Sequence, residues 1–356
     1  MTTIHQPSEA DIGELSDLLR VVTPEIAELL ECRYSILKTV SYNQPIGRRN
    51  LSQLIGITER VLRKEAEILK DNGLLEFSSE GMNVSELGFR ALDSLGVFFH
   101  DLRGLRRMES ELERVLRIRK VLVVPSVSED DDVCLKDIGR ATAGYLKTIL
   151  SDGAVLGITG GSTLFRVIEA FRKENRKYHD LLVVPARGGV GDRAEYQANT
   201  LTEKLAKKLD SRYKLLYTPD FLSKLSIEAL RNEPAIREIM DWVEKIDILV
   251  FGVGKAETMA RRRNLEPGEI KSILEKGAVA EAFGYYFNQE GEIVHELSTI
   301  GITLEHFKKL KHIIAVAGGD EKAEAIISIS KLNGELVLVT DEEAASKILR
   351  IYEEEM

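Results

Sequence analysis

The sequence predicts an α/β protein in two parts, a small helical N-terminal part and a larger C-terminal part built on a parallel sheet. Apolar residues at helical spacing dominate the chain up to residue 119. From Lys120 onward, short continuous apolar runs alternate with helical stretches, the pattern of a sheet covered by helices on both faces. The length of 356 residues agrees with two domains, at about 150 residues for each.

The composition indicates an ordered protein of a reducing compartment. The chain is 44% hydrophobic and 30% charged, enough to bury a core and stay in solution. Its two cysteines, Cys32 and Cys134, are far apart and lack metal-ligand spacing, so we expect idle thiols and no metal site. Residues 1–10 lack an apolar signal core, and no apolar run reaches the roughly 20 residues that cross a bilayer. We therefore expect a cytoplasmic protein with no membrane contact.

Helices are predicted at both ends of the N-terminal part. Residues 1–30 form one or two amphipathic helices, the second starting at Pro24 with Thr23 as its cap. The apolar residues of the first are Ile12, Leu15, Leu18 and Leu19. Residues 85–119 are also predicted to be helical, rich in leucine and in alternating charge toward their end. We expect residues 97–119 to be a linker that joins the domains or subunits.

Three helices and a hairpin are predicted within residues 31–96. A helix over residues 34–40 precedes a turn at Gly47 and a short helix over residues 49–54, and a third helix runs from Thr58 to about residue 70. The expected caps are Asn50 and Thr58, and the expected inward face of the third helix is Val61, Leu62, Ala66 and Leu69.

A hairpin wing follows the third helix. Asn72 and Gly73 end that helix with a left-handed stop, and residues 74–78 and 83–84 form two short strands around a turn at residues 79–82. A helix, short helix, tight turn and third helix followed by a wing is the order of a winged helix-turn-helix. Residues 1–96 are therefore predicted to be a DNA-binding domain.

The charge distribution supports DNA binding at this domain. Residues 33–70 contain eight basic and three acidic side chains, a local charge of +5 on a chain of net charge −9. The first residues of the third helix would lie nearest the bases, with arginines before the second helix on phosphates. The candidate DNA-binding residues are Arg48, Arg49, Thr58, Arg60, Arg63 and Lys64. The alternative is a small helical bundle with a basic surface, and Glu59 among the candidates weakens any base-level assignment.

The C-terminal part, residues 120–356, is predicted to be a Rossmann-like domain with a parallel sheet. Alternating strands and helices give parallel neighbours by right-handed crossovers. The expected strands lie at residues 121–125, 154–158, 181–185, 214–217, 248–253, 312–316 and 335–339.

A glycine-rich turn follows the second of these strands. Residues 157–163 read Gly-Ile-Thr-Gly-Gly-Ser-Thr and lead into a helix. Glycines let the backbone approach an anion, and the free N–H groups and dipole of the helix N-terminus favour negative charge. The turn lacks the lysine of a P-loop and the spacing of a dinucleotide fold. Tight packing is the alternative explanation.

Three further predicted strands end in glycines beside cations. The segments are Pro-Ala-Arg-Gly-Gly at 185–189, Phe-Gly-Val-Gly-Lys at 251–255, and Ala-Gly-Gly-Asp at 317–320 with Lys322 just beyond. Ligands of open parallel sheets bind outside the carboxyl ends of strands. Arg187 and Lys322 beside these turns predict a small polyanionic ligand, and Arg261–Arg263 are either a second phosphate clamp or a solvated basic turn.

These segments resemble the SorC/DeoR-type sugar-binding transcriptional regulators over nearly the whole chain. The residues that carry the resemblance lie at 158–163, 197–199, 247–254, 277–281 and 315–323, of which the last two are the most specific. Within that family, the Pro-Ala-Arg-Gly-Gly loop and the long N-terminal extension are most similar to regulators of central glycolytic genes.

The resemblance implies a C-terminal fold similar to glucosamine-6-phosphate deaminase and ribose-5-phosphate isomerase. It also implies a repressor that forms dimers or tetramers, binds double-stranded operator DNA and is released by fructose 1,6-bisphosphate, with no cofactor. Its effector contacts would map onto Gly160, Gly161, Ser162 and Thr163 for one phosphate, and onto Arg187, Gln197, Arg262, Glu281 and Lys322 for the sugar and the other phosphate. Gln197 is alternatively a solvated helix residue, and Glu281 alternatively pairs with a nearby cation.

Two other functions remain open. The first is an enzyme of the same fold, a sugar-phosphate isomerase or deaminase. Such an enzyme would need an acid/base pair, and no histidine lies at a strand end for that role. An added DNA-binding unit also has no purpose in such an enzyme, so we expect no enzymatic activity. The second is a regulator with another effector, such as a pentitol phosphate, a deoxyribose phosphate or an unphosphorylated sugar.

Overall fold

The computed structural model describes residues 22–126, 131–171, 177–190 and 193–354. It divides into an N-terminal unit, Met1–Met108 with Pro125–Cys134, and a C-terminal unit, Glu109–Val124 with Leu135–Met356. The amphipathic helix predicted over residues 12–19 lies outside the described residues. No helix in the described part of the chain is long and apolar enough to span a membrane.

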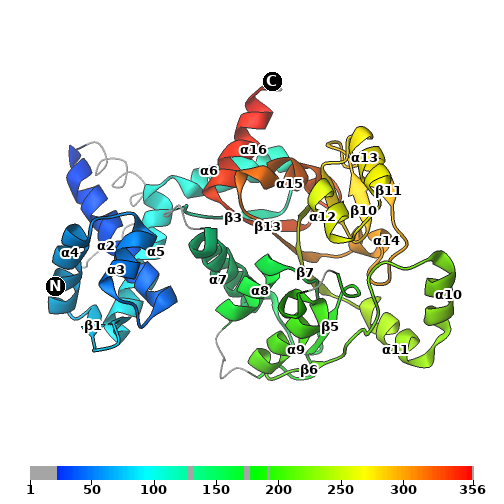
Figure 1. The fold of residues 1–356 in the computed structure, drawn as a ribbon, viewed down its shortest axis with the longest axis horizontal. Coiled ribbons are helices and arrows are strands. Elements are labelled where there is room, and N and C mark those ends of the chain that lie inside the picture. Colours follow the sequence, from blue (N-terminus) through cyan, green and yellow to red (C-terminus); the bar gives the residue numbers. More distant parts are fainter. Residues whose placement is uncertain (1–21, 127–130, 172–176, 191–192, 355–356) are drawn as a thin grey trace, which may run out of the picture. The chain divides into compact units, whose positions relative to one another are not determined.

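The N-terminal unit is a helix-turn-helix with a two-stranded wing (Figure 1). Its elements are α2 (Pro24–Asn43), α3 (Arg48–Ile55), α4 (Glu59–Asp71), β1 (Leu75–Phe77), β2 (Met82–Val84) and α5 (Glu86–Leu102). Gly56 ends α3 in the left-handed region, at φ 73°, and Thr58 caps α4 by accepting a hydrogen bond from the N–H of Val61 at 3.4 Å. The winged architecture predicted from the sequence is therefore confirmed.

Three local predictions in this unit are wrong. Gly47 rather than Asn50 caps α3, because the helix starts one residue earlier than expected, at Arg48. Val61 is 44% exposed, so the inward stripe of α4 begins at Leu62. The helix predicted over residues 85–119 is broken at Gly104, whose φ of 66° ends the helical path between α5 and α6 (Leu105–Leu116).

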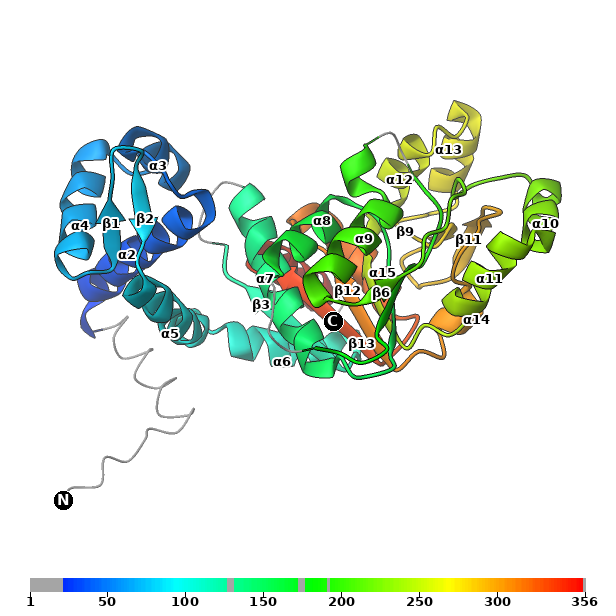
Figure 2. The same ribbon diagram turned by 90° about the horizontal axis from the view of Figure 1, so that it is seen from below.

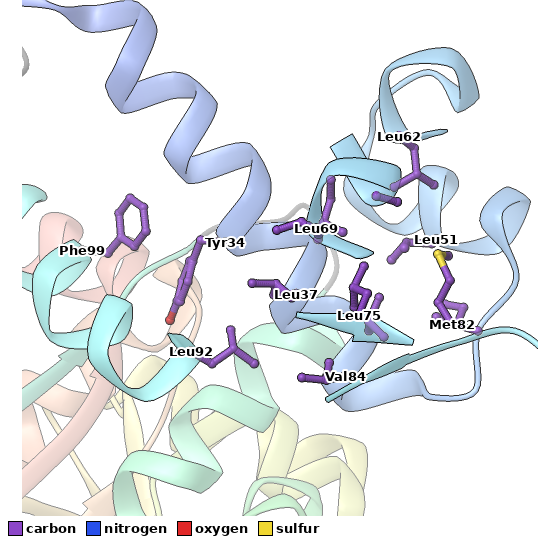
Figure 3. Packing of buried hydrophobic residues seen from close by; sticks show 14 residues of the cluster. Tyr34, Leu37, Leu51, Leu62, Leu69, Leu75, Met82, Val84, Leu92 and Phe99 are labelled. Carbon is purple, nitrogen blue, oxygen red and sulfur yellow. The ribbon is translucent and has the colours of Figure 1, made fainter. Parts of the chain in front are cut away.

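One apolar cluster joins the three helices to the wing (Figure 3). Leu37 of α2, Leu51 of α3 and Leu62 of α4 are at most 1% exposed and face Leu75 and Met82 of the hairpin. The wing is also held by backbone hydrogen bonds between Ile46 and Met82 in both directions. The hairpin and the helices therefore share one core, to which α4 contributes its buried face.

The C-terminal unit contains a seven-stranded sheet whose strand pairs are all parallel. Its strands are β3 (Lys120–Val124), β4 (Val155–Ile158), β5 (Leu182–Pro185), β6 (Arg212–Tyr213), β7 (Ile248–Gly252), β12 (His312–Val316) and β13 (Leu336–Asp341), in the spatial order β3-β13-β12-β7-β4-β5-β6. Every residue of β4, β5 and β13 is buried, as expected for strands covered on both faces. The parallel-sheet prediction is confirmed, except that the strand expected at 214–217 lies at Arg212–Tyr213 instead.

Helices cover both faces of this sheet, with α7, α8 and α9 on one side and α15 and α16 on the other (Figures 1 and 2). The helices are α7 (Asp131–Ile149), α8 (Ser162–Ala170), α9 (Ala198–Leu209), α10 (Lys224–Asn232), α11 (Pro234–Val243), α12 (Ala256–Arg262), α13 (Pro267–Glu275), α14 (Leu304–Phe307), α15 (Ala323–Ser330) and α16 (Glu342–Glu354). A smaller antiparallel sheet, not predicted from the sequence, consists of β8 (Gly254–Lys255), β9 (Ala280–Ala282), β10 (Tyr285–Phe287) and β11 (Ile293–Glu296).

Helix α6 covers the β3 edge of the large sheet with two carboxylates. Glu113 Oε1 accepts a hydrogen bond from the N–H of Val121 at 3.0 Å, and Glu109 Oε1 accepts one from the N–H of Val123 at 2.8 Å. These N–H groups point away from β13 and have no strand beside them. The side chains of α6 therefore replace the missing neighbour strand.

Candidate functional site

All six candidate DNA-binding residues are exposed on the N-terminal unit. Arg60, Arg63 and Lys64 lie on α4, Arg48 and Arg49 begin α3, and Thr58 stands at the turn between the two helices. Glu65 of α4 is withdrawn from this surface, because it is 3% exposed and its Oε2 lies 2.8 Å from Nε of Arg33.

Four arginines of this surface have no internal partner. Within the described residues, Arg48, Arg49, Arg60 and Arg63 form no salt bridge, so their N–H groups are available to an external anion. The hydroxyl of Thr58 is already engaged as the cap of α4. The exposed first turns of α3 and α4 are therefore a cationic surface of the kind that contacts DNA phosphates and bases.

A pocket of about 650 Å³ lies in the C-terminal unit at the rim where parallel strands end. The chain runs outward from β4 through β5 to β6, then returns to β7 beside β4 and runs outward the other way. This reversal between β4 and β7 is a topological switch point, where the loops diverge and leave a crevice. The pocket is lined by Gly160, Gly161, Ser162, Arg187, Gly188, Val190, Arg193, Tyr196, Gln197, Ala198, Met259, Arg262 and Asn264.

The predicted glycine turn forms one wall of this pocket. Gly161 has a φ of 128° that side-chain-bearing residues rarely adopt, and its N–H donates to the carbonyl oxygen of Tyr196 at 2.9 Å. Helix α8 starts at Ser162 without a side-chain cap, so its first N–H groups have no intrahelical acceptor. The N-terminus of α8 therefore offers N–H donors and a positive dipole end to a ligand in the pocket. Thr163 lies in this first turn but outside the lining residues.

The lining carries three arginines, and no carboxylate is among the described residues that line the pocket. Arg262 is exposed, and Arg193 lies over the ring of Tyr196, 5.6 Å from its centroid. The amide of Gln197 bonds the backbone of Val190 in both directions at 3.0 Å, so this side chain holds the loop after β5. The charge of the pocket lining favours an anionic ligand.

Lys322 adds positive charge near Arg262, although it does not line the pocket. Burial lowers the pKa of Lys322, and the charges of Lys255 and Arg262 lower it further against the opposing effect of Glu321. Because the positive charges of Lys255 and Arg262 act on Lys322, an anion bound near Lys322 would offset this repulsion. The charges of Lys255 and Lys322 therefore add to that of Arg262, the one of the three that lines the pocket.

Arg187 belongs to a buried group of four charged side chains that we name the charge cluster: Arg187, Asp220, Arg263 and Glu281. Arg187 forms a fork with Asp220, through Nε to Oδ1 at 2.9 Å and through Nη2 to Oδ2, and its Nη1 lies 3.7 Å from Oε1 of Glu281. Arg263 bonds Oε1 of Glu281 at 2.8 Å and Oδ2 of Asp220 at 3.2 Å. Each side chain is at most 10% exposed.

Glu281 is fully enclosed in this cluster rather than placed among the lining residues. Burial raises its pKa, but the guanidinium groups of Arg263 and Arg187 and the N–H of Gly284 outweigh burial and hold that pKa below its ordinary value. The carboxylate is therefore ionised and paired. The sequence analysis missed Asp220. It named Arg263 only as part of a candidate phosphate clamp, whereas the structure pairs Arg263 with Asp220 and Glu281.

The three successive arginines have three different environments. Arg261 is exposed and pairs with Glu257 at 2.7 Å, Arg262 lines the pocket, and Arg263 is buried in the charge cluster. The pocket also includes Arg193, Tyr196, Met259 and Asn264, which no sequence motif marked. The structure brings together Gly160, Gly161, Ser162, Arg187, Gln197 and Arg262 of the predicted effector residues.

Comparison with known proteins identifies a DNA-binding domain and a sugar-binding domain in this chain. Residues 29–99 match the family "CggR N-terminal DNA binding domain", and residues 100–350 match the family "Putative sugar-binding domain". The chain is 38% identical to the central glycolytic genes regulator of Bacillus subtilis and 37% identical to that of Priestia megaterium, with 95% of this chain and 99% of each relative covered.

Solved structures show the same fold. The "putative SorC family transcriptional regulator" from Enterococcus faecalis is 33% identical, with a TM-score of 0.64 over 68% of this chain and 99% of that one. The full-length sorbitol operon regulator SorC from Klebsiella pneumoniae covers 97% of this chain and 100% of its own, with a TM-score of 0.67 at 16% identity.

A DNA-binding domain joined to a sugar-binding domain defines a transcriptional regulator, and these relatives are regulators rather than enzymes. The chain belongs to the SorC-type family of sugar-binding transcriptional regulators, and its N-terminal domain is of the kind found in central glycolytic genes regulators. The predicted family and the predicted absence of enzymatic function are thereby confirmed.

Proposed function

We propose that this protein represses central glycolytic genes and that fructose 1,6-bisphosphate, bound in the C-terminal pocket, lowers its affinity for operator DNA. The observation that carries the proposal is one pocket lined both by the glycine turn at the N-terminus of α8 and by Arg187, Arg193 and Arg262. A bisphosphate would place one phosphate at the N-terminus of α8 and the other at the arginines. The two relatives named as central glycolytic genes regulators support the choice of target genes.

The regulatory step is a shift between two states of the protein. The effector must bind the state that releases DNA better than the state that holds it. Linkage then lowers operator affinity by a coupling of about 1–3 kcal/mol, which is about 5- to 150-fold. The helices over residues 97–119 are the proposed route, because they connect the two domains along the chain. We expect a dimer or tetramer in solution, which sedimentation would measure.

The direct test is operator affinity with and without fructose 1,6-bisphosphate. The proposal expects at least fivefold weaker DNA binding with the sugar, in the range of about 1–3 kcal/mol of coupling. An unchanged affinity would refute the proposed regulation. A thermal-shift screen of phosphorylated and free sugars identifies the effector, because a ligand that binds only the native state raises the melting temperature. A larger shift with a pentitol phosphate or deoxyribose phosphate would replace the proposed effector.

Neighbouring arginines provide a matched pair of variants for the effector site. Arg262→Ala removes a lining cation and should weaken fructose 1,6-bisphosphate binding by about tenfold or more, the cost of one charged hydrogen bond. Arg261→Ala removes an exposed arginine that pairs with Glu257 and should leave binding unchanged. Equal effects of the two variants would show that Arg262 does not contact the effector.

A further inference from the structure

Two members of the charge cluster do not line the effector pocket and have no assigned role there: Asp220, which no motif marked, and Arg263, which was expected only as part of a phosphate clamp. Arg263 is enclosed, with its side chain 2% exposed, and it contacts both carboxylates of the cluster without lining the pocket. Arg187 is the one member that reaches the pocket lining. The state of Arg187 therefore depends on how its carboxylate partners are compensated.

The cluster is electrically balanced only because Arg263 is present. Two guanidinium groups face two carboxylates, so the cluster as a whole carries no net charge. Without Arg263, Arg187 alone would face Asp220 and Glu281, leaving one uncompensated negative charge beside an anion pocket. This charge would repel a phosphate bound in the pocket, because charges a few ångströms apart in a protein interact more strongly than in bulk water.

Arg263 also determines where Arg187 points. Nε and Nη2 of Arg187 are held by Asp220, while Glu281 is engaged by Arg263 at 2.8 Å and lies 3.7 Å from Nη1 of Arg187. Loss of Arg263 would free Glu281 to draw in Nη1. The N–H groups of Nη1 would then be bound inside the protein rather than available to a ligand.

We propose that Arg263 is a positioning residue of the effector pocket: it neutralises Asp220 and Glu281, so that Arg187 offers its charge and its Nη1 donors to an anionic effector. This inference rests on the proposed effector function of the pocket. It assigns an electrostatic role to a side chain that the ligand does not touch, and it makes affinity depend on the net charge of the cluster.

The test is a charge-compensation cycle measured by calorimetric titration of the full-length protein with fructose 1,6-bisphosphate. Arg263→Met gives the cluster a charge of −1 and should weaken binding by about tenfold. Adding Asp220→Asn restores neutrality at a carboxylate that was not a predicted effector contact, and the double variant should bind within about threefold of the unaltered protein. The control is Arg261→Ala, at an exposed arginine two residues before Arg263, and this variant should bind normally.

The dependence of affinity on salt separates charge from simple loss of structure. An uncompensated carboxylate makes the affinity of Arg263→Met rise relative to the unaltered protein as salt is added, because screening weakens the repulsion. A purely structural defect leaves the ratio of the two affinities constant. Three results would each overturn the proposal. Arg263→Met could bind the effector normally, or the ratio of its affinity to that of the unaltered protein could stay constant as salt is added. The third result is a double variant that unfolds cooperatively but does not regain effector affinity.

Asp220→Asn alone serves if Arg263→Met does not fold. It keeps an acceptor oxygen for Nε of Arg187 and gives the cluster a charge of +1, so binding should be equal or tighter, and weaker binding would overturn the proposal. Parallel titrations with inorganic phosphate follow the anion site itself. Binding of phosphate without binding of fructose 1,6-bisphosphate by the unaltered protein would refute the effector identity, while the ranking of variants still decides the role of Arg263.

Discussion

A methyl group added at Gly160 should prevent the glycine turn before α8 from binding a phosphate of the effector. A Cβ built at this position would lie 2.5 Å from the carbonyl oxygen of Tyr196 and 3.1 Å from the backbone nitrogen of Ala198. Both are backbone atoms, so Gly160→Ala must displace the turn before α8 by at least about 0.5 Å. The N–H donors of that turn would then miss a bound phosphate.

The expected loss of affinity follows from the number of hydrogen bonds affected. A hydrogen bond to a charged group contributes about 1.5–3 kcal/mol, so losing one such bond and straining a second predicts about 2–3 kcal/mol. That free energy corresponds to a roughly 30- to 150-fold rise in the Kd for fructose 1,6-bisphosphate, measured by calorimetric titration. Overpacking should also lower the stability of the domain by about 1–3 kcal/mol, measured by chemical denaturation.

The matched control is Gly144→Ala within α7. A Cβ at Gly144 meets no atom within 4 Å, and the residue lies inside a helix, so alanine should stabilise the protein by about 1 kcal/mol and leave Kd unchanged. A Kd for Gly160→Ala within twofold of the unaltered protein would refute the reasoning, because phosphate would then not lie at the N-terminus of α8.

Three further outcomes are expected. Burial and the charges of Lys255 and Arg262 hold the pKa of Lys322 below its ordinary value of 10.5. Only the protonated amine attracts phosphate, so effector affinity should fall as pH rises through that lowered pKa. Effector titrations at increasing pH measure this fall, and an affinity that does not change with pH would exclude Lys322 from the site. Arg63→Ala should weaken operator binding by about 1–3 kcal/mol in gel-shift titrations and leave the effector-induced melting shift intact, and a lost shift would contradict separate sites. Leu62→Ala, at a side chain that is 0% exposed, should destabilise the N-terminal unit by about 2–5 kcal/mol in urea unfolding, and a cost below about 1 kcal/mol would contradict the packing of Figure 3.

The sequence predicted the parts of the fold that depend on local pattern. The continuous apolar runs found the buried strands, and Thr58 and Gly56 marked the ends of helices in the DNA-binding unit. The strand expected at 214–217 was misplaced because pairing with β5 ends early, at the N–H of Lys214 on the carbonyl oxygen of Val183. The apolar run that follows leaves the sheet, and its Tyr217 is 78% exposed.

The small antiparallel sheet escaped prediction because its strands are short and mixed in character. The strand Ala280–Ala282 carries Glu281 between two alanines, which reads as neither an alternating nor a continuous apolar strand. The turn that joins it to Tyr285–Phe287 uses positive φ at both Phe283 and Gly284. Only Gly284 was a local signal of that turn.

The candidate site divides in the same way. Glycines that follow a strand within a short stretch of sequence predict an anion-binding turn, so Gly160 and Gly161 could be found from the sequence. The partners of Arg187 could not, because Asp220 lies 33 residues away along the chain and Arg263 lies 43 residues beyond Asp220. No pattern within the triplet Arg261–Arg263 distinguishes the residue that lines the pocket from the residue that is buried.

The carboxylates of α6 have a consequence for dissecting the protein into fragments. A C-terminal fragment cut at Lys120 would lose Glu109 and Glu113 and leave the N–H groups of Val121 and Val123 without acceptors. Such a bare strand recruits strands from other molecules, so the fragment should self-associate and precipitate at concentrations where a fragment starting before Leu105 stays dispersed. Helix α6 should therefore reduce the tendency of the C-terminal unit to aggregate, and comparing the two fragments would measure this effect.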